Sequence, residues 1–220
     1  MAQQQYQAVV FDMDGVMFDS EPLHIKAWQV VMAELGYDLP YEAIATCIGI
    51  PDYDSAHFVQ RYCGTEISAE ELLARKTALY PEMAAAAVTP FPGVAEGLAQ
   101  LSARVPIALA TSCFAYETEL LLGRTNLIQF FPIRVTAEMV TQRKPEPEPF
   151  QLAMNLIGSV PAHTLAVEDS PAGVMAARAA GCTVLAVTSS HKPAQLAQAH
   201  RIFPTTAEAI EWMLGEVISE

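Results

Sequence analysis

The sequence predicts an α/β protein with a Rossmann-like, three-layer parallel sheet core into which a small helical bundle is inserted. Two observations carry this prediction. Short, continuously apolar runs alternate with helical patterns along most of the chain, which is typical of βαβ units. One long stretch, residues 20–89, instead shows helical periodicity and no convincing strand.

Four apolar runs predict the strands of the core. They are continuous rather than alternating, as a parallel sheet covered on both faces requires. The four runs are Tyr6–Phe11, Val105–Thr111, Thr164–Val167 and Cys182–Val187.

Helical patterns lie between these runs and throughout the insertion. Ser170 and Pro171 form a favourable helix start, and Gly158 a favourable helix end. The core helices are expected at Gly93–Ser102, Phe150–Ile157 and Pro171–Ala180, and those of the insertion at Pro22–Glu34, Tyr41–Thr46, Asp54–Tyr62 and Ala69–Ala86. We therefore expect residues 1–19 and 90–220 to form the core and residues 20–89 the insertion.

Composition and net charge exclude some classes of binding partner and indicate the cellular compartment. The 220 residues are 52% hydrophobic, which is enough for a sizeable core and argues against disorder. A formal net charge of −13 disfavours nucleic acid and anionic membrane surfaces as partners, whereas a small phosphorylated substrate is compatible with it if a metal reverses the charge locally. The start of the sequence shows no export signal, and no apolar run approaches the ~20 residues of a membrane span. The four cysteines form no CxxC pair, so we expect reduced thiols in a cytoplasmic protein.

Two aspartates follow the first predicted strand. Asp12 and Asp14 are separated by one residue, and Gly15 permits a tight turn after them. Such a pair can hold a hard cation and divide the work of nucleophile and acid/base. The alternative is an ordinary Asx-rich turn.

Three further signals come at the ends of neighbouring segments. Thr111 and Ser112 end the second strand, where a hydroxyl and free N–H groups suit a phosphate oxygen, although many strands end this way. Lys144, in a proline-rich approach to a helix, is either a rigidly presented cation or a solvated loop residue. Glu168 and Asp169 end the third strand, either as metal ligands or as acids favoured at a helix N-terminus.

Taken together, these motifs resemble those of the haloacid dehalogenase-like (HAD) hydrolase superfamily over nearly the whole chain. DMDGV matches the first motif, Thr111 the second, Lys144 in KPEPEPF the third and EDSPAG the fourth. The segment FDSEPLH resembles the start of the helical cap domain in the branch that contains β-phosphoglucomutase and small sugar-phosphate phosphatases. The resemblance implies that the inserted bundle is a cap domain.

The resemblance also implies roles for the acidic residues. Asp12 would be the nucleophile that forms an aspartyl phosphate, and Asp14 the acid and base. Mg²⁺ would be held by Asp12, the backbone carbonyl of Asp14 and Asp169, with Glu168 in support. Asp14 also favours phosphate esters over haloacids, because the carbon–halogen-cleaving members lack an acid there.

The remaining core motifs would bind the phosphoryl group. Thr111, the backbone of Ser112 and Lys144 would hold its oxygens, in keeping with the positioning and charge neutralisation that phosphoryl transfer needs. A small phosphorylated metabolite is the expected substrate, and a monomer is the expected state.

Cap residues bear on whether phosphate passes to water or to a second sugar position. His24 matches a mutase residue, with an ordinary helix-face histidine near the hinge as the alternative. Ser20 matches a hinge threonine, and Arg75 with Lys76 resembles a basic pair that reaches the substrate. The mutases also use an arginine in a loop where this chain has residues 49–54 with acidic Asp52, which would repel a second phosphate. We therefore expect a phosphatase, with a β-phosphoglucomutase and a non-catalytic HAD-like binding protein as alternatives.

Overall fold

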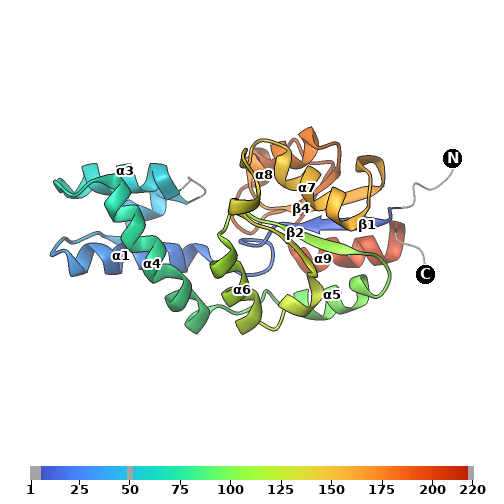
Figure 1. Ribbon diagram of the computed structural model, residues 1–220, viewed down its shortest axis with the longest axis horizontal. Helices are drawn as coiled ribbons and strands as arrows, with labels where there is room; N and C mark the ends of the chain where they lie inside the picture. The colour runs from blue at the N-terminus through green and yellow to red at the C-terminus, as the bar shows by residue number, and fades with distance from the viewer. Residues whose placement is uncertain (1–5, 49–51, 218–220) are drawn as a thin grey trace. The chain divides into compact units, whose positions relative to one another are not determined.

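The computed structural model describes residues 6–48 and 52–217 (Figure 1). Within them the chain divides into two compact units. One holds the residues up to Asp19 and from Thr89 onward, and the other runs from Ser20 to Val88. The expected bounds of the insertion, 20–89, differ from these by one residue.

The first unit contains a six-stranded parallel sheet in the order β3-β2-β1-β4-β5-β6. Its strands are β1 Ala8–Phe11, β2 Ile107–Ala110, β3 Ile133–Val135, β4 Thr164–Glu168, β5 Thr183–Val187 and β6 Arg201–Phe203. Every residue of β1, β2 and β4 is buried, as their apolar runs require. The predicted α/β class with a parallel sheet is confirmed.

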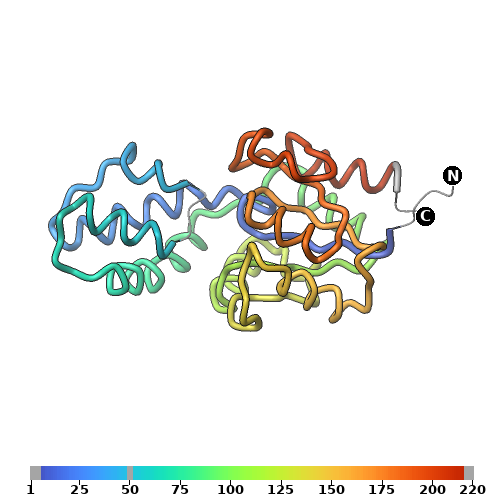
Figure 2. The backbone as a smooth tube through the Cα atoms, turned by 90° about the horizontal axis from the view of Figure 1, so that it is seen from above, coloured from blue at the N-terminus to red at the C-terminus, as the bar shows by residue number. Residues whose placement is uncertain are grey.

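Helices cover both faces of this sheet (Figures 1 and 2). Helices α7, Glu148–Ile157, and α8, Pro171–Ala179, pack against one face. Helix α9, Thr206–Trp212, packs against the other face at β5 and β6, and α5, Val94–Ser102, packs against α9. The result is the predicted three-layer arrangement.

The predicted ends of two core helices are confirmed. The Ser170 hydroxyl accepts a hydrogen bond from the Gly173 amide at 3.0 Å, which caps α8, and Pro171 is its first residue. Gly158 ends α7 with a φ of 69°, a left-handed conformation that favours glycine.

The second unit is helical. Helix α4, Ala69–Ala87, packs against α1, Glu21–Glu34, and α3, Asp52–Cys63, and a short helix α2 covers Tyr41–Ile44. Trp28, Met32, Val59 and Leu72 are among the buried residues of its own apolar core. No strand occurs in the described part of this unit, as predicted.

Four elements of the core were not predicted. Strands β3 and β6 have only three residues and are partly exposed, so neither forms a continuous apolar run. Helix α6, Ala115–Arg124, and helix α9 were also missed. Short turns of 3₁₀-helix cover Ala45–Cys47, Ile128–Phe130, Ala137–Met139, Pro161–His163 and Pro193–Leu196, and a π-helical turn covers Met213–Val217.

Two sequence-level expectations concern the chain as a whole. All four cysteines are free thiols, two of them buried. None of the helices in the described residues has the length and hydrophobicity needed to cross a membrane.

Candidate active site

The candidate site lies at the carboxyl ends of the central strands. Strand β1 pairs with β2 on one side and β4 on the other, and the chain order reverses there, which is where open α/β sheets bind ligands. The Asp12 amide donates to the Val167 carbonyl at 3.0 Å, so Asp12 continues β1 beside the end of β4. The β-sheet register thereby brings the first and fourth motifs together.

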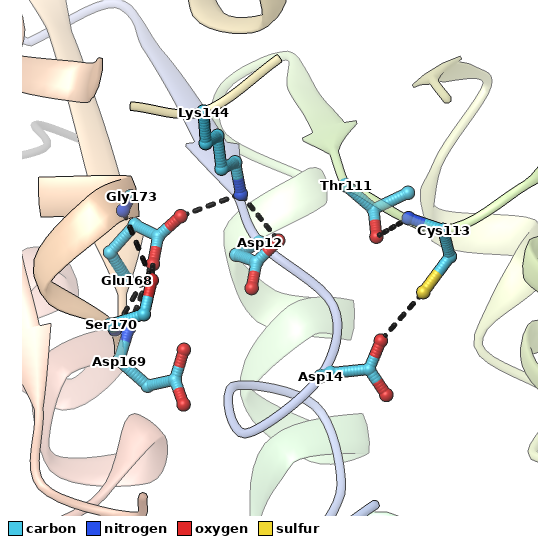
Figure 3. A network of polar contacts seen from close by, with 9 residues as sticks. All are labelled: Asp12, Asp14, Thr111, Cys113, Lys144, Glu168, Asp169, Ser170 and Gly173. Carbon is cyan, nitrogen blue, oxygen red and sulfur yellow. Dashed lines mark hydrogen bonds and ion pairs between the residues drawn. The ribbon is translucent and has the colours of Figure 1, made fainter. Parts of the chain in front are cut away.

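Lys144 lies between the carboxylates of these two motifs (Figure 3). Its Nζ is 2.6 Å from Asp12 Oδ1 and 2.6 Å from Glu168 Oε1, and its side chain is only 6% exposed. The solvated-loop alternative for Lys144 is therefore excluded by its position. Burial alone would lower the pKa of the ammonium, but Asp12 and Glu168 raise it instead, so Lys144 is a permanent cation here.

Burial has the opposite effect on the nearby acids. It raises the pKa of Asp12 to about 7, against the lowering effect of Lys144. It also raises the pKa of Asp169 well above its usual range, and the charges of Glu168 and Asp12 add to this effect. Ionising both acids would therefore place more negative charge here than Lys144 alone neutralises.

Glu168 is held from several sides. Its Oε2 accepts hydrogen bonds from the Asp169 amide at 3.1 Å and from the Ser170 hydroxyl at 3.1 Å, while Oε1 faces Lys144. A Cβ at Gly173 would overlap the Glu168 carboxylate, so the glycine of the fourth motif lets the first turn of α8 approach this acid. These contacts fix Glu168 in one orientation.

Three acidic side chains of the site are close enough together to bind a hard divalent cation. One carboxylate oxygen from each of Asp12, Glu168 and Asp169 lies within 4.8 Å of the others. Carboxylate oxygens are the ligands that Mg²⁺ and similar cations prefer, and a cation there would offset the excess negative charge. The residues present therefore fit a divalent metal.

Asp14 is on the other side of Asp12, facing β2 (Figure 3). Its Oδ2 accepts a hydrogen bond from the Cys113 thiol at 2.9 Å, and the Cys113 amide donates to the Thr111 hydroxyl at 3.1 Å. Its Oδ1 is buried and has no hydrogen-bond partner among the described residues. Cys113 belongs to none of the four motifs, and its contact with Asp14 was not predicted from the sequence.

The predicted phosphate-binding residues lie around the same strand ends. Thr111 is buried after β2, where its amide donates to the Val135 carbonyl at 3.0 Å, and Ser112 follows at an exposed position. Gly15 has a φ of 70°, so it makes the tight turn that the sequence suggested. The site residues predicted in the core thus lie together at the carboxyl ends of the central strands.

Three of the predicted cap residues form a separate cluster within the helical unit. Lys76, 1% exposed, has its Nζ 2.6 Å from Asp52 Oδ2 and 2.7 Å from His24 Nδ1. The Tyr80 ring stacks on His24 with centroids 4.0 Å apart and lies 4.5 Å from the Lys76 ammonium. The pKa of Asp52 is lowered, since the attraction of Lys76 and His24 outweighs its burial.

The other two cap residues lie outside this cluster. Arg75 is exposed and pairs with Glu71 at 2.8 Å along α4, so Arg75 and Lys76 do not act as one basic pair. The reason is that neighbouring helical residues point in directions about 100° apart. Ser20 is buried, and its carbonyl accepts from the His24 amide at 3.0 Å at the start of α1. Of residues 49–54, which match the loop where the mutases use an arginine, residues 49–51 lie outside the described residues.

A comparison with protein families decides the identity of the fold. The family model of haloacid dehalogenase-like hydrolases matches residues 9–187, which include all four motifs. The chain belongs to this family. The resemblance inferred from its motifs is confirmed, and so is the fold with an inserted cap domain.

Relatives of this HAD-like hydrolase include named phosphatases. It is 31% identical over 178 residues to fructose-1-phosphate phosphatase YqaB of Escherichia coli, covering 81% of this chain and 94% of the relative. It is 33% identical over 217 residues to the phosphoglycolate phosphatase of Thiobacillus denitrificans, covering 92% and 93%. A crystal structure of a candidate β-phosphoglucomutase from Thermotoga maritima superposes with a TM-score of 0.80 at 29% identity, covering 94% of this chain and 98% of that one.

Proposed function

We propose that this protein is a Mg²⁺-dependent phosphatase that hydrolyses small phosphorylated metabolites, such as sugar or polyol phosphates, through an aspartyl phosphate on Asp12. The observation that carries the proposal is the position of Asp12 between the Lys144 ammonium and the Asp14 carboxylate at the end of β1 (Figure 3). The named phosphatases among its relatives support the same reaction class.

The first half of the reaction uses Asp12 as nucleophile. One Asp12 carboxylate oxygen attacks phosphorus, and the bond from phosphorus to the ester oxygen breaks in line with it. Asp14 gives its proton to the departing oxygen, which leaves as an alcohol. Lys144 neutralises negative charge on the phosphoryl oxygens, and Thr111 with the backbone of Ser112 orients them.

The second half returns the protein to its starting state. A water molecule attacks the aspartyl phosphate while Asp14 takes up its proton, and the bond between phosphorus and Asp12 breaks. Inorganic phosphate leaves, and Asp12 is again a free carboxylate. Asp12, Asp169 and the Asp14 carbonyl, with Glu168 in support, would hold Mg²⁺, which would supply charge neutralisation for the phosphoryl group.

The cap cluster favours water over a second sugar position as the phosphate acceptor. A mutase must hold a substrate with two phosphates, and so needs a cation with free donors in its cap. In this chain two of the three Lys76 N–H donors are already engaged by Asp52 and His24, the Lys76 side chain is only 2% exposed, and the Asp52 side chain beside it is 43% exposed. A carboxylate repels a second phosphate and accepts hydrogen bonds from hydroxyl groups.

The test is a phosphate-release screen with purified protein and Mg²⁺ over hexose, pentose, triose and polyol phosphates. The proposal expects release of inorganic phosphate from one or more of them. Interconversion of β-glucose 1-phosphate and glucose 6-phosphate with no release of phosphate from any substrate would establish the mutase instead. Neither reaction, together with no binding of Mg²⁺ at millimolar concentration, would establish a non-catalytic binding protein.

A further inference from the structure

A segment outside the four motifs touches two of them. It is the loop Thr188–Lys192, which follows β5 and is named the β5 loop below. Its serines and its histidine belong to none of the four motifs in the sequence. In the structure these side chains reach the turn after β1 and the turn after β4.

The first contact is with the turn after β1. The Ser189 hydroxyl donates a hydrogen bond to the Gly15 carbonyl. A Cβ at Gly15 would overlap the Asp169 carboxylate and would come within 2.6 Å of Ser190 Oγ. The backbone of Gly15, the Asp169 carboxylate and the Ser190 hydroxyl therefore pack directly against one another.

The other two contacts are with Asp169 itself. The Ser190 hydroxyl is a hydrogen-bond partner of the Asp169 carboxylate. His191 Nδ1 is 3.0 Å from the Asp169 carbonyl, and because a carbonyl only accepts, this nitrogen carries the proton. One residue of the metal-fitting group is thus held through both its side chain and its backbone.

The β5 loop is itself anchored at both ends. The Thr188 amide donates to the Phe203 carbonyl at 3.1 Å, which ties the loop to β6. The Lys192 amide donates to Gln195 Oε1 at 3.1 Å, which ties it to the following 3₁₀ turn. Side chains presented from such a fixed loop can hold a neighbouring carboxylate in one orientation.

We propose that Ser190 and His191 are positioning residues that orient Asp169 toward the divalent cation, with Ser189 fixing the adjacent turn at Gly15. Partners that orient a metal-binding carboxylate commonly change metal affinity 10- to 100-fold when removed. Ser190 and His191 act through Asp169 and do not touch the reacting phosphoryl group. The inference rests on the proposed function only in assuming that the Asp12, Glu168 and Asp169 group holds a metal.

The test is binding of Mn²⁺, a paramagnetic substitute for Mg²⁺, to purified protein, measured by electron paramagnetic resonance and compared with phosphate release at varied Mg²⁺. Ser190→Ala and His191→Ala are each expected to weaken Mn²⁺ binding about 10-fold and to raise the Mg²⁺ concentration for half-maximal activity equally. Their kcat at saturating Mg²⁺ should stay within about 3-fold of the unsubstituted protein, because the reacting groups remain. His191→Asn should recover most of the affinity, since its amide nitrogen can replace Nδ1 as donor to the Asp169 carbonyl.

The matched control is Ser102→Ala, which removes an exposed hydroxyl that bonds only within α5 at the Ala99 carbonyl. It should leave both readouts unchanged. If Ser190→Ala and His191→Ala bind Mn²⁺ as tightly as the unsubstituted protein, the positioning role is refuted while the phosphatase proposal stands. If the unsubstituted protein itself neither binds Mn²⁺ nor releases phosphate, it is the proposed function that fails.

Discussion

Replacing Lys144 with methionine tests the electrostatic account of the site. Among the described residues, Lys144 is the one cation that contacts Asp12 and Glu168, at 2.6 Å from each, and the two acidic side chains are 12% and 0% exposed. Methionine keeps much of the apolar stem and removes the charge, so it leaves these carboxylates close together without a counter-charge. Breaking a buried ion pair in this way costs about 3–5 kcal/mol of unfolding free energy.

The stability lost in Lys144→Met should be larger at high pH than at low pH. Burial raises the pKa of Asp12 to about 7 despite the lowering effect of Lys144, so loss of Lys144 raises this pKa further. A raised carboxyl pKa means that the neutral form stabilises the fold, and this contribution is lost as the pH rises through the folded-state pKa. The variant should therefore lose about 3–5 kcal/mol at pH 8 and clearly less at pH 5.5.

The assay is urea unfolding in EDTA, followed by tryptophan fluorescence. A Trp28→Phe background leaves Trp212, which lies in the same compact unit as Lys144, as the reporter. The control Lys26→Met removes an exposed lysine of α1 and should change stability by less than about 0.5 kcal/mol. A loss below about 1 kcal/mol at pH 8, or an equal loss at both pH values, would refute the reasoning.

Three further predictions concern the turn after β1, the cap and the metal. Gly15→Ala should lower the free energy of unfolding by about 1–2 kcal/mol, because Gly15 has a left-handed φ. It should also lower metal affinity about 10-fold, because the added Cβ would overlap the Asp169 carboxylate. Unchanged Mn²⁺ binding would argue against that packing. Asp52→Asn should lower the stability of the cap by about 1 kcal/mol at pH 7, because its partner Lys76 is buried while Asp52 is partly exposed. Since the pKa of Asp52 is lowered, this loss, measured by thermal unfolding, should shrink as the pH falls below the ordinary value of 3.8 and vanish below the lowered pKa of the folded state. Asp54→Asn on the same helix should show no such loss. EDTA should abolish phosphate release and added Mg²⁺ should restore it; full activity in EDTA would exclude the metal-dependent reaction.

The sequence predicted the centre of the sheet better than its edges. Strands β1, β2, β4 and β5 are continuous apolar runs because helices or loops bury both of their faces, and their predicted bounds are within two residues at each end. The edge strands β3 and β6 are short and carry Arg134 and Arg201, whose side chains reach solvent, so they lack that signal.

Some residues of the candidate site could likewise be predicted from the sequence, and some of its contacts could not. Asp12, Thr111, Lys144 and Glu168 could be identified because each follows a strand or belongs to a motif, and parallel strands bring these ends together. The contacts of the β5 loop with Gly15 and Asp169 could not, since serine and histidine in a loop carry no local pattern and the pairing spans more than 170 residues for Ser189 and Gly15.

The cap gives a second example of this limit. Arg75 and Lys76 are adjacent and equally basic in the sequence, which suggested one pair. Only packing shows that α4 buries Lys76 against Asp52 and His24 while Arg75 stays at the surface.

The most direct test of the central claim is the fate of phosphorus on Asp12. The protein and its Asp12→Asn variant are each mixed with a substrate from the phosphate-release screen, quenched in acid within one turnover and digested for mass spectrometry. The account predicts a phosphoryl group on the Asp12 peptide of the unsubstituted protein, and in the variant neither this modification nor measurable turnover despite an unchanged circular dichroism spectrum. Phosphate release by Asp12→Asn at the rate of the unsubstituted protein would contradict it.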